Sequence, residues 1–120
     1  MAKILTIDDS VSLRRLLASA LKSAGHSVTE ADSGASALGI AQGASFDLVI
    51  SDLNMPGMDG LALVGALRKL APYRAVPILI LTTEMDPTKK QAAKAAGATG
   101  WLVKPFDPVQ LLATIRKVLD

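Results

Sequence analysis

Side chains with the means to do chemistry stand directly after four apolar, strand-like runs of this sequence. In chain order they are Asp8 and Asp9, Asp52, Thr82 and Lys104. If these strand ends meet, the three carboxylates repel one another by several kcal/mol per contact at an effective dielectric constant of about 20. A hard divalent cation relieves this repulsion. A site of few protein oxygens with room for water suits Mg²⁺ better than zinc or a full calcium cage.

Asp52 is the central acid of this set and the candidate nucleophile. Its carboxylate ends a run that should be a buried strand, where desolvation costs several kcal/mol unless a partner or cation compensates. Lys104 supplies a positive charge and Thr82 a hydroxyl donor. A carboxylate that faces a metal ion, a lysine and a hydroxyl is equipped to attack phosphorus and form an acyl phosphate. Asp8 and Asp9 are adjacent and can share the metal.

Several of these residues, taken alone, also have a purely structural interpretation, although Asp8 does not. Asp9 is suited to cap the following helix, as is Ser10. Thr82 alone is an ordinary strand-end residue, and Lys104 alone is a solvated charge. We expect Asp59 to be a helix cap and not a ligand. The functional interpretation is favoured because four different strands place suitable groups at the same end.

The elements that must position these residues alternate between strand-like and helix-like periods five times. Short apolar or β-branched runs predict strands at residues 4–7, 27–31, 47–51, 76–81 and 100–103. Cap residues and apolar spacings of three and four predict helices between these strands and after the last one, over residues 10–25, 33–43, 59–70, 86–97 and 107–119. The polar second strand should lie at an edge of the sheet. The fourth helix, rich in alanine and lysine, should be the least firmly anchored.

Five strand–helix units in this order predict an α/β fold, with a parallel sheet, helices on both faces and right-handed crossovers. In such sheets the functional crevice lies at the carboxyl ends of the strands. The candidate residues should therefore converge at one edge. A chain of 120 residues suits one domain over residues 1–120.

Composition excludes several other classes of protein. There is no cysteine, hence no disulfide, no thiolate nucleophile and no cysteine-ligated metal. Thirteen Lys and Arg against eleven Asp and Glu, with few aromatic residues, argue against direct nucleic-acid binding. No apolar run reaches the roughly 18 residues of a membrane span. The N-terminus lacks the pattern of a signal peptide, so we expect a cytoplasmic protein with no membrane partner.

Four motifs closely resemble those of the receiver domain of two-component response regulators. They are Asp8-Asp9-Ser10, the run Asp-Leu-Asn-Met-Pro-Gly-Met-Asp-Gly at residues 52–60, Thr82, and Lys104-Pro105-Phe106. The resemblance covers the entire chain with every landmark in order. It implies a doubly wound, five-stranded parallel sheet of flavodoxin-like order 2-1-3-4-5 with five helices.

The resemblance also implies roles for the site residues. Asp52 accepts a phosphoryl group from the phosphohistidine of a histidine kinase, or from small phosphodonors. Asp9, Asp52 and the backbone carbonyl of Asn54 bind Mg²⁺, and Asp8 helps through water. Thr82 donates a hydrogen bond to the phosphoryl oxygens and Lys104 pairs with them. Such a protein promotes its own phosphorylation and dephosphorylation, and it is a signalling switch, not an enzyme.

Two further stretches narrow the resemblance to stand-alone chemotaxis regulators of the CheY type. They are residues 81–84 and 97–104, with a cis peptide expected before Pro105. Trp101 occupies the place of the family's switching aromatic, although a ring fixed in one rotamer is the alternative. We expect a partner surface on the fourth helix, fifth strand and fifth helix, whose basic character favours acidic partner segments. It includes Lys90, Lys94, Trp101 and Lys117.

The partners implied are a histidine kinase and a flagellar motor switch protein or another downstream protein, with a phosphatase also allowed. We expect a monomer. Asn54 and Glu84 flank the site and should govern water access. Two alternatives remain: a phosphate shuttle or sink in another phosphorelay, and a non-phosphorylated scaffold. A flavodoxin-like cofactor binder is disfavoured because two aspartates, not a glycine-rich loop, follow the first strand.

Overall fold

The protein is described from a computed structural model, which covers residues 2–83 and 86–120. Five parallel strands form one sheet in the order β2-β1-β3-β4-β5. The strands are β1 (Lys3–Ile7), β2 (Ser27–Ala31), β3 (Leu48–Ser51), β4 (Ile78–Thr82) and β5 (Gly100–Val103). The helices are α1 (Val11–Ser23), α2 (Gly34–Gly43), α3 (Gly60–Arg68), α4 (Pro87–Ala96) and α5 (Pro108–Leu119), with a short 3₁₀ helix, η1 (Ala71–Tyr73).

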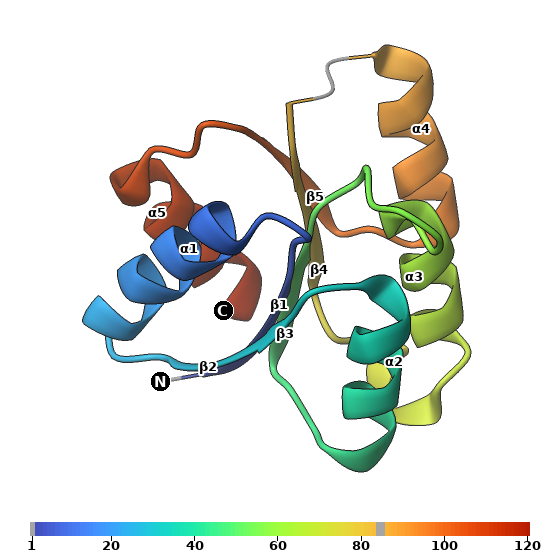
Figure 1. The fold of residues 1–120 in the computed structure, drawn as a ribbon, viewed down its shortest axis with the longest axis horizontal. Helices are drawn as coiled ribbons and strands as arrows, with labels where there is room; N and C mark the ends of the chain where they lie inside the picture. Colours follow the sequence, from blue (N-terminus) through green and yellow to red (C-terminus); the bar gives the residue numbers. More distant parts are fainter. Residues whose placement is uncertain (1, 84–85) are drawn as a thin grey trace.

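Helices cover both faces of the sheet. Figure 1 shows α1 and α5 together on one side and α2, α3 and α4 on the other. This arrangement and the strand order confirm the predicted doubly wound fold. The polar strand β2 lies at an edge, as its sequence predicted. No helix in the described part of the chain is long and apolar enough to cross a bilayer.

The alternation of side chains along β3 divides the core into two layers. Leu48 and Ile50 pack into the cluster under α1 and α5, whereas Val49 joins the cluster under α2 and α3. All four residues of β3 are buried, as expected for a central strand of a parallel sheet covered on both faces. The strand therefore holds its carboxyl end, where Asp52 follows, in a fixed place.

Short polar side chains fix where the helices begin. Ser10, not Asp9, caps α1, because its hydroxyl accepts a hydrogen bond from the Leu13 N–H at 3.4 Å. The structural interpretation of Asp9 as a cap is therefore wrong. Asp59 caps α3 by accepting from the Ala62 N–H at 2.8 Å, as expected.

Several element boundaries differ from the sequence prediction by one or two residues, and two of them lie near a proline. β4 begins at Ile78, not at residue 76, because Pro77 has no N–H to donate to a strand ladder. α3 ends at Arg68, two residues before the expected end, and η1 follows, with Pro72 in its first turn. The predicted weak anchoring of α4 agrees with its burial, since Ala93 is its one buried residue among those described.

Candidate functional site

Neighbouring strands bring the candidate acids together at the carboxyl edge of the sheet. Ile7 at the end of β1 lies opposite Ser51 at the end of β3, so Asp8 and Asp52 leave the sheet side by side. The Asp52 N–H donates to the Ile7 carbonyl at 2.9 Å, which extends the pairing by one residue. Asp8 and Asp52 are only 5% and 8% exposed. Both carboxylates are therefore largely shielded from bulk solvent.

Lys104 reaches this pair of acids from the other side. Its Nζ lies 2.8 Å from Asp8 Oδ2 and 3.3 Å from Asp52 Oδ1. Its backbone N–H donates to the Thr82 carbonyl at 2.8 Å, which continues the β4–β5 ladder to the start of the next turn. The Lys104–Pro105 peptide bond is cis, as the resemblance implied. One buried cation thus bridges two buried carboxylates.

Burial is the main influence on the charge of Asp52. It raises the pKa of the Asp52 carboxyl, and the neighbouring Asp8 raises that pKa further. The charge of Lys104 opposes both effects, as does the Leu53 N–H, which donates to Asp52 Oδ1 at 2.8 Å. The net effect is a raised pKa, so the folded environment disfavours the charged form of Asp52 relative to the unfolded chain. A second cation in the crevice, in addition to Lys104, would stabilise the charged form of Asp52.

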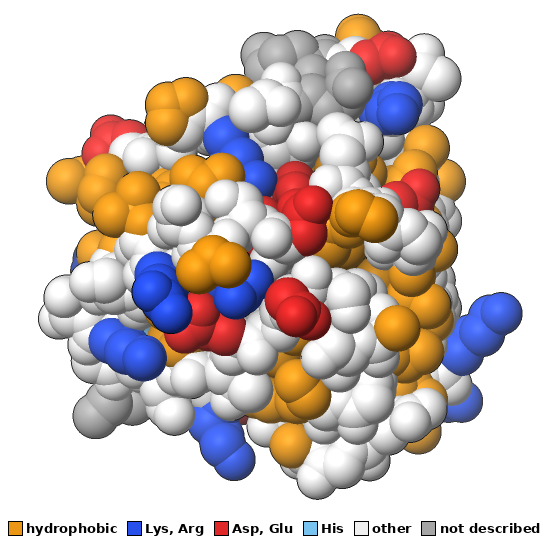
Figure 2. Space-filling view, in the orientation of Figure 1, with side chains coloured by type: hydrophobic (Ala, Val, Ile, Leu, Met, Phe, Trp, Pro, Cys, Tyr) orange, Lys and Arg blue, Asp and Glu red, His pale blue; other side chains and the backbone are white. Residues whose placement is uncertain are grey.

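Three carboxylates are placed to share such a cation. Oxygen atoms of Asp8, Asp9 and Asp52 all lie within 4.8 Å of one another. Asp9 is exposed, which leaves one side of the cluster open to water. Carboxylate oxygens with open positions for water are the donor set that Mg²⁺ prefers. The residues present therefore fit the ion that the sequence predicts. Figure 2 shows acidic and basic side chains next to each other on the face of the molecule that it draws.

The remaining predicted site residues are Thr82, Asn54 and Glu84. Thr82 is the last residue of β4 and is 1% exposed, at the same edge of the sheet as the acids. Asn54 is exposed two residues after Asp52, and its role in holding a metal stays a prediction. Glu84 lies outside the described residues.

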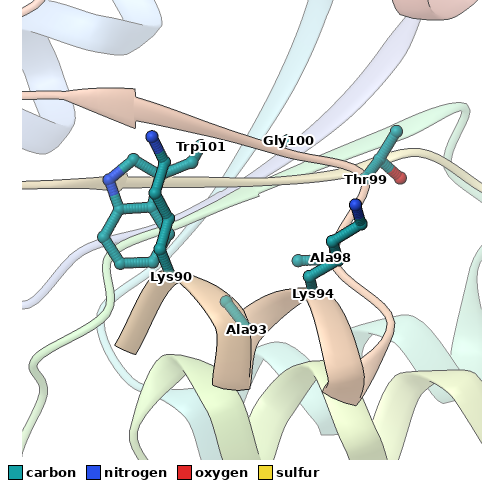
Figure 3. Close-up of a pocket in the computed structure, with 7 residues that line it drawn as sticks. All are labelled: Lys90, Ala93, Lys94, Ala98, Thr99, Gly100 and Trp101. Carbon is teal, nitrogen blue, oxygen red and sulfur yellow. The ribbon is translucent and has the colours of Figure 1, made fainter. Parts of the chain in front are cut away.

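The predicted partner surface is brought together in part. A cavity of about 270 Å³ lies between α4 and β5, and Lys90, Lys94 and Trp101 line it. Figure 3 shows the Lys90 side chain alongside the Trp101 ring, with Lys94 farther along the helix. Trp101 is half-buried and packs against the core cluster under α2 and α3. Lys117 is exposed on α5 and does not line this cavity.

Sequence reasoning assigned no role in the site to two residues that shape it. Gly60 at the start of α3 has no room for a side chain, because a Cβ there would collide with the Asp52 carbonyl oxygen and lie 2.9 Å from the Leu53 Cα. Arg14 in α1 donates from Nη1 to the Asp8 carbonyl at 2.7 Å. A glycine one residue after a cap was a visible signal for the first contact. The contact of Arg14 with the Asp8 carbonyl had only a weak signal in the sequence, namely the tendency of helical side chains to point toward the helix N-terminus.

Comparison with known proteins decides the family. Residues 4–116 match the response regulator receiver domain. The chain belongs to this family. Protein PilH of Pseudomonas aeruginosa is 38% identical over 119 residues, which cover 99% of this chain and 98% of PilH. The chemotaxis protein CheY of the same organism is 36% identical, with 98% of this chain and 96% of CheY covered.

Solved structures of receiver domains agree with the architecture. Chemotaxis protein CheY4 of Vibrio cholerae superposes with a TM-score of 0.95 at 52% identity, and the match covers 98% of each chain. A response regulator from Burkholderia multivorans gives a TM-score of 0.83 at 45% identity, over 100% of this chain and 97% of the other. The fold and the family of this receiver domain are thus established together.

Proposed function

We propose that this receiver domain is a phosphoacceptor switch, in which Asp52 accepts a phosphoryl group from the phosphohistidine of a histidine kinase. The observation that carries this proposal is the position of Lys104 Nζ, 2.8 Å from Asp8 and 3.3 Å from Asp52 at the carboxyl edge of the sheet. Burying the charged groups of Lys104, Asp8 and Asp52 carries a large desolvation penalty. That penalty is hard to explain if the ion pairs have no chemical role. A site that must receive an anionic group has a use for both the lysine and the acids.

The contacts of Asp52 indicate which of its oxygens reacts. Oδ1 accepts the Leu53 N–H and lies near Lys104, whereas no described residue donates a hydrogen bond to Oδ2. Oδ2 is therefore the nucleophile: its bond to phosphorus forms while the bond from phosphorus to the donor's imidazole nitrogen breaks. The electron pair of that bond returns to the imidazole. The new phosphoryl oxygens need positive charge and hydrogen-bond donors, which Lys104 and the Thr82 hydroxyl supply.

The acids next to Asp52 have a second task, to hold Mg²⁺. Asp8, Asp9 and Asp52 would bind it, with the Asn54 backbone carbonyl as the ligand that the family resemblance adds. When bound, the ion offsets the negative charge that phosphoryl transfer brings into the crevice. The 2.8 Å contact between Lys104 Nζ and Asp8 Oδ2 holds the lysine in the site before a phosphoryl group arrives.

Intact mass spectrometry tests the phosphoacceptor. The protein is incubated with Mg²⁺ and a small phosphodonor, either an acyl phosphate or a phosphoramidate. We expect a gain of one phosphoryl group that Asp52→Asn abolishes, with Asp59→Asn as the matched control that retains it. Asp59 is a capping acid seven residues along the same loop. No gain in the parent protein, or a gain that survives Asp52→Asn, would disprove the proposal.

The output surface is proposed to comprise α4, β5 and α5, with Trp101 as the aromatic lever. The cavity beside Trp101 and the lysines Lys90 and Lys94 at its rim support this choice, since they offer an apolar floor and positive charge to an acidic partner segment. Lys117 extends the basic character to α5. Titration with a phosphate analogue should move amide NMR signals along residues 86–105. Unmoved signals there would refute the surface while leaving phosphorylation of Asp52 intact.

The names of the relatives support a role in chemotaxis, in which the phosphorylated protein binds a flagellar motor switch component. CheY and CheY4 are both described as chemotaxis proteins. A phosphate shuttle or sink in another relay keeps the same chemistry with a different partner, and capture of the motor component by the phosphorylated but not the Asp52→Asn protein separates the two. We propose that the switch works in the cytoplasm as a single, monomeric domain and not as an enzyme.

A further inference from the structure

Asp8 is held in the acidic site by four contacts. Its N–H donates to the Ala31 carbonyl at 3.2 Å, and its Oδ1 accepts from the Ser10 N–H at 2.9 Å. Its Oδ2 accepts from Lys104 Nζ at 2.8 Å. The fourth contact is the hydrogen bond from Arg14 Nη1 to its backbone carbonyl, at 2.7 Å. The first three contacts extend the strand pairing, close the turn and form the ion pair. The hydrogen bond from Arg14 has no equally evident structural use.

Asp9 is held in a different way. It is exposed, and no described residue forms a hydrogen bond with its side chain. The direction of that side chain depends on the backbone on either side of it. The peptide unit before it is planar and contains the Asp8 carbonyl, so a bond to that carbonyl restrains the plane from which Asp9 projects. Arg14 is the residue that makes this bond.

Arg14 is itself braced. Its Nε lies 3.4 Å from Glu30 Oε1 on β2, and its side chain is only 15% exposed. A guanidinium is flat and rigid, so one nitrogen anchored on β2 leaves the other aimed in a fixed direction. Helix α1, strand β2 and the turn at Asp8 are therefore joined through one side chain.

We propose that Arg14 is a positioning residue of the acidic site, which strengthens divalent-cation binding by fixing the Asp8–Asp9 peptide unit. This inference rests on the proposed function, because it concerns the metal site of the phosphoacceptor. Arg14 does not touch the cation. It acts through Asp9, whose carboxylate has no other restraint among the described residues.

Charge and position make opposite predictions for this residue. Removing a positive charge near three carboxylates favours a bound cation on Coulombic grounds. Removing a brace from the turn disfavours it, because Asp9 must then be ordered when the metal binds. The sign of the change in affinity therefore separates a positioning role from a merely electrostatic one.

Arg14→Gln and Arg15→Gln form the matched pair for the experiment. Both remove one positive charge from α1, but Arg15 is exposed and has no hydrogen bond or ion pair among the described residues. Mg²⁺ binding to each metal-free protein is measured by titration calorimetry. Arg14→Gln should weaken binding about tenfold, the lower end of the range for residues that orient metal ligands. Arg15→Gln should tighten it by less than about twofold at physiological salt.

Arg14→Lys keeps the charge and loses the planar fork, so it should also weaken binding. It serves as the second variant if Arg14→Gln unfolds, which urea denaturation reports. In the metal-free state, amide NMR signals of Asp9 and Ser10 should shift in Arg14→Gln and stay in place in Arg15→Gln. If the parent protein binds no Mg²⁺, the proposed function fails. If the parent binds it and Arg14→Gln binds as tightly as Arg15→Gln, or Arg14→Lys binds as tightly as the parent, the positioning role is wrong.

Discussion

Replacing Lys104 by methionine should destabilise the metal-free protein at neutral pH. At 2.8 Å from Asp8 and 3.3 Å from Asp52, the lysine contributes gross attractions of about 6 and about 5 kcal/mol at an effective dielectric constant of 20. Desolvation of the ammonium group, whose side chain is 9% exposed, offsets much of this sum. Removing one partner of a buried pair costs about 3–5 kcal/mol. We expect a loss of about 3 kcal/mol in the free energy of unfolding at pH 7.

The loss should depend on pH in a direction that the site dictates. Burial and Asp8 raise the pKa of Asp52 in the folded protein, and removing Lys104 raises that pKa further. A raised pKa means that protonated Asp52 favours folding, a contribution that is present at acid pH and is lost as the pH rises through the folded pKa. The Lys104→Met protein should therefore be closer to the parent at pH 5 than at pH 7.

Urea denaturation followed by far-UV circular dichroism, in the presence of a chelator, measures both effects. Lys117→Met is the control, because Lys117 is exposed on α5 and its substitution should change stability by less than about 0.5 kcal/mol. Added Mg²⁺ should narrow the gap between Lys104→Met and the parent, since a cation replaces the missing charge. A loss below about 1 kcal/mol at pH 7, or an equal loss at both pH values, would refute the electrostatic account.

Three further substitutions test the packing that supports the site, each by urea denaturation. Thr6 is fully buried and its Oγ1 has no hydrogen-bond partner among the described residues, so Thr6→Val should stabilise the protein by about 1 kcal/mol; a destabilised protein would reveal a partner for that hydroxyl. Tyr73 Oη lies 2.6 Å from the Ala44 carbonyl and 3.0 Å from the Ala41 carbonyl, and Tyr73→Phe should cost about 1–2 kcal/mol by leaving them without this donor; an unchanged midpoint would contradict this. Gly60→Ala places a Cβ against the Asp52 carbonyl oxygen and should lower the free energy of unfolding by about 1–3 kcal/mol. Gly65→Ala is the control, because nothing lies within 4 Å of its new Cβ, and it should be neutral or stabilising. Equal stabilities of the two variants would show that the backbone at Asp52 can shift to make room.

The succession of strands and helices could be predicted from the sequence because its signals are local, whereas the strand order came from the family resemblance. Leu48, Val49 and Ile50 form a continuous apolar run, which is typical of a central strand whatever the rest of the chain does. Asp107 before Pro108 defines a helix start within two residues, and the structure has that cap. Boundaries were less accurate where a single proline decided them, as at Pro77, since strand pairing depends on a neighbour elsewhere in the chain.

The acidic site was predictable as a set of residues but not as a geometry. Parallel strands end at one edge of a sheet, so the order of elements alone placed Asp8, Asp52 and Lys104 near one another. It did not say that one ammonium group would contact both acids, across a separation of 96 residues in the case of Asp8. Arg14 was missed for a related reason, because its target is a backbone carbonyl and carries no side-chain signature.

The sequence by itself therefore determined the succession of strands and helices, the caps that begin them, and the acids, hydroxyl and lysine at the strand ends. Periodicity and turn chemistry act over a few residues, and those features depend on little else. The tertiary structure decided the contacts of Lys104, the brace from Arg14 through Glu30, and the missing space at Gly60. Each of these depends on the placement of separate segments relative to one another to within a few tenths of an ångström, which only the packing of the whole core sets.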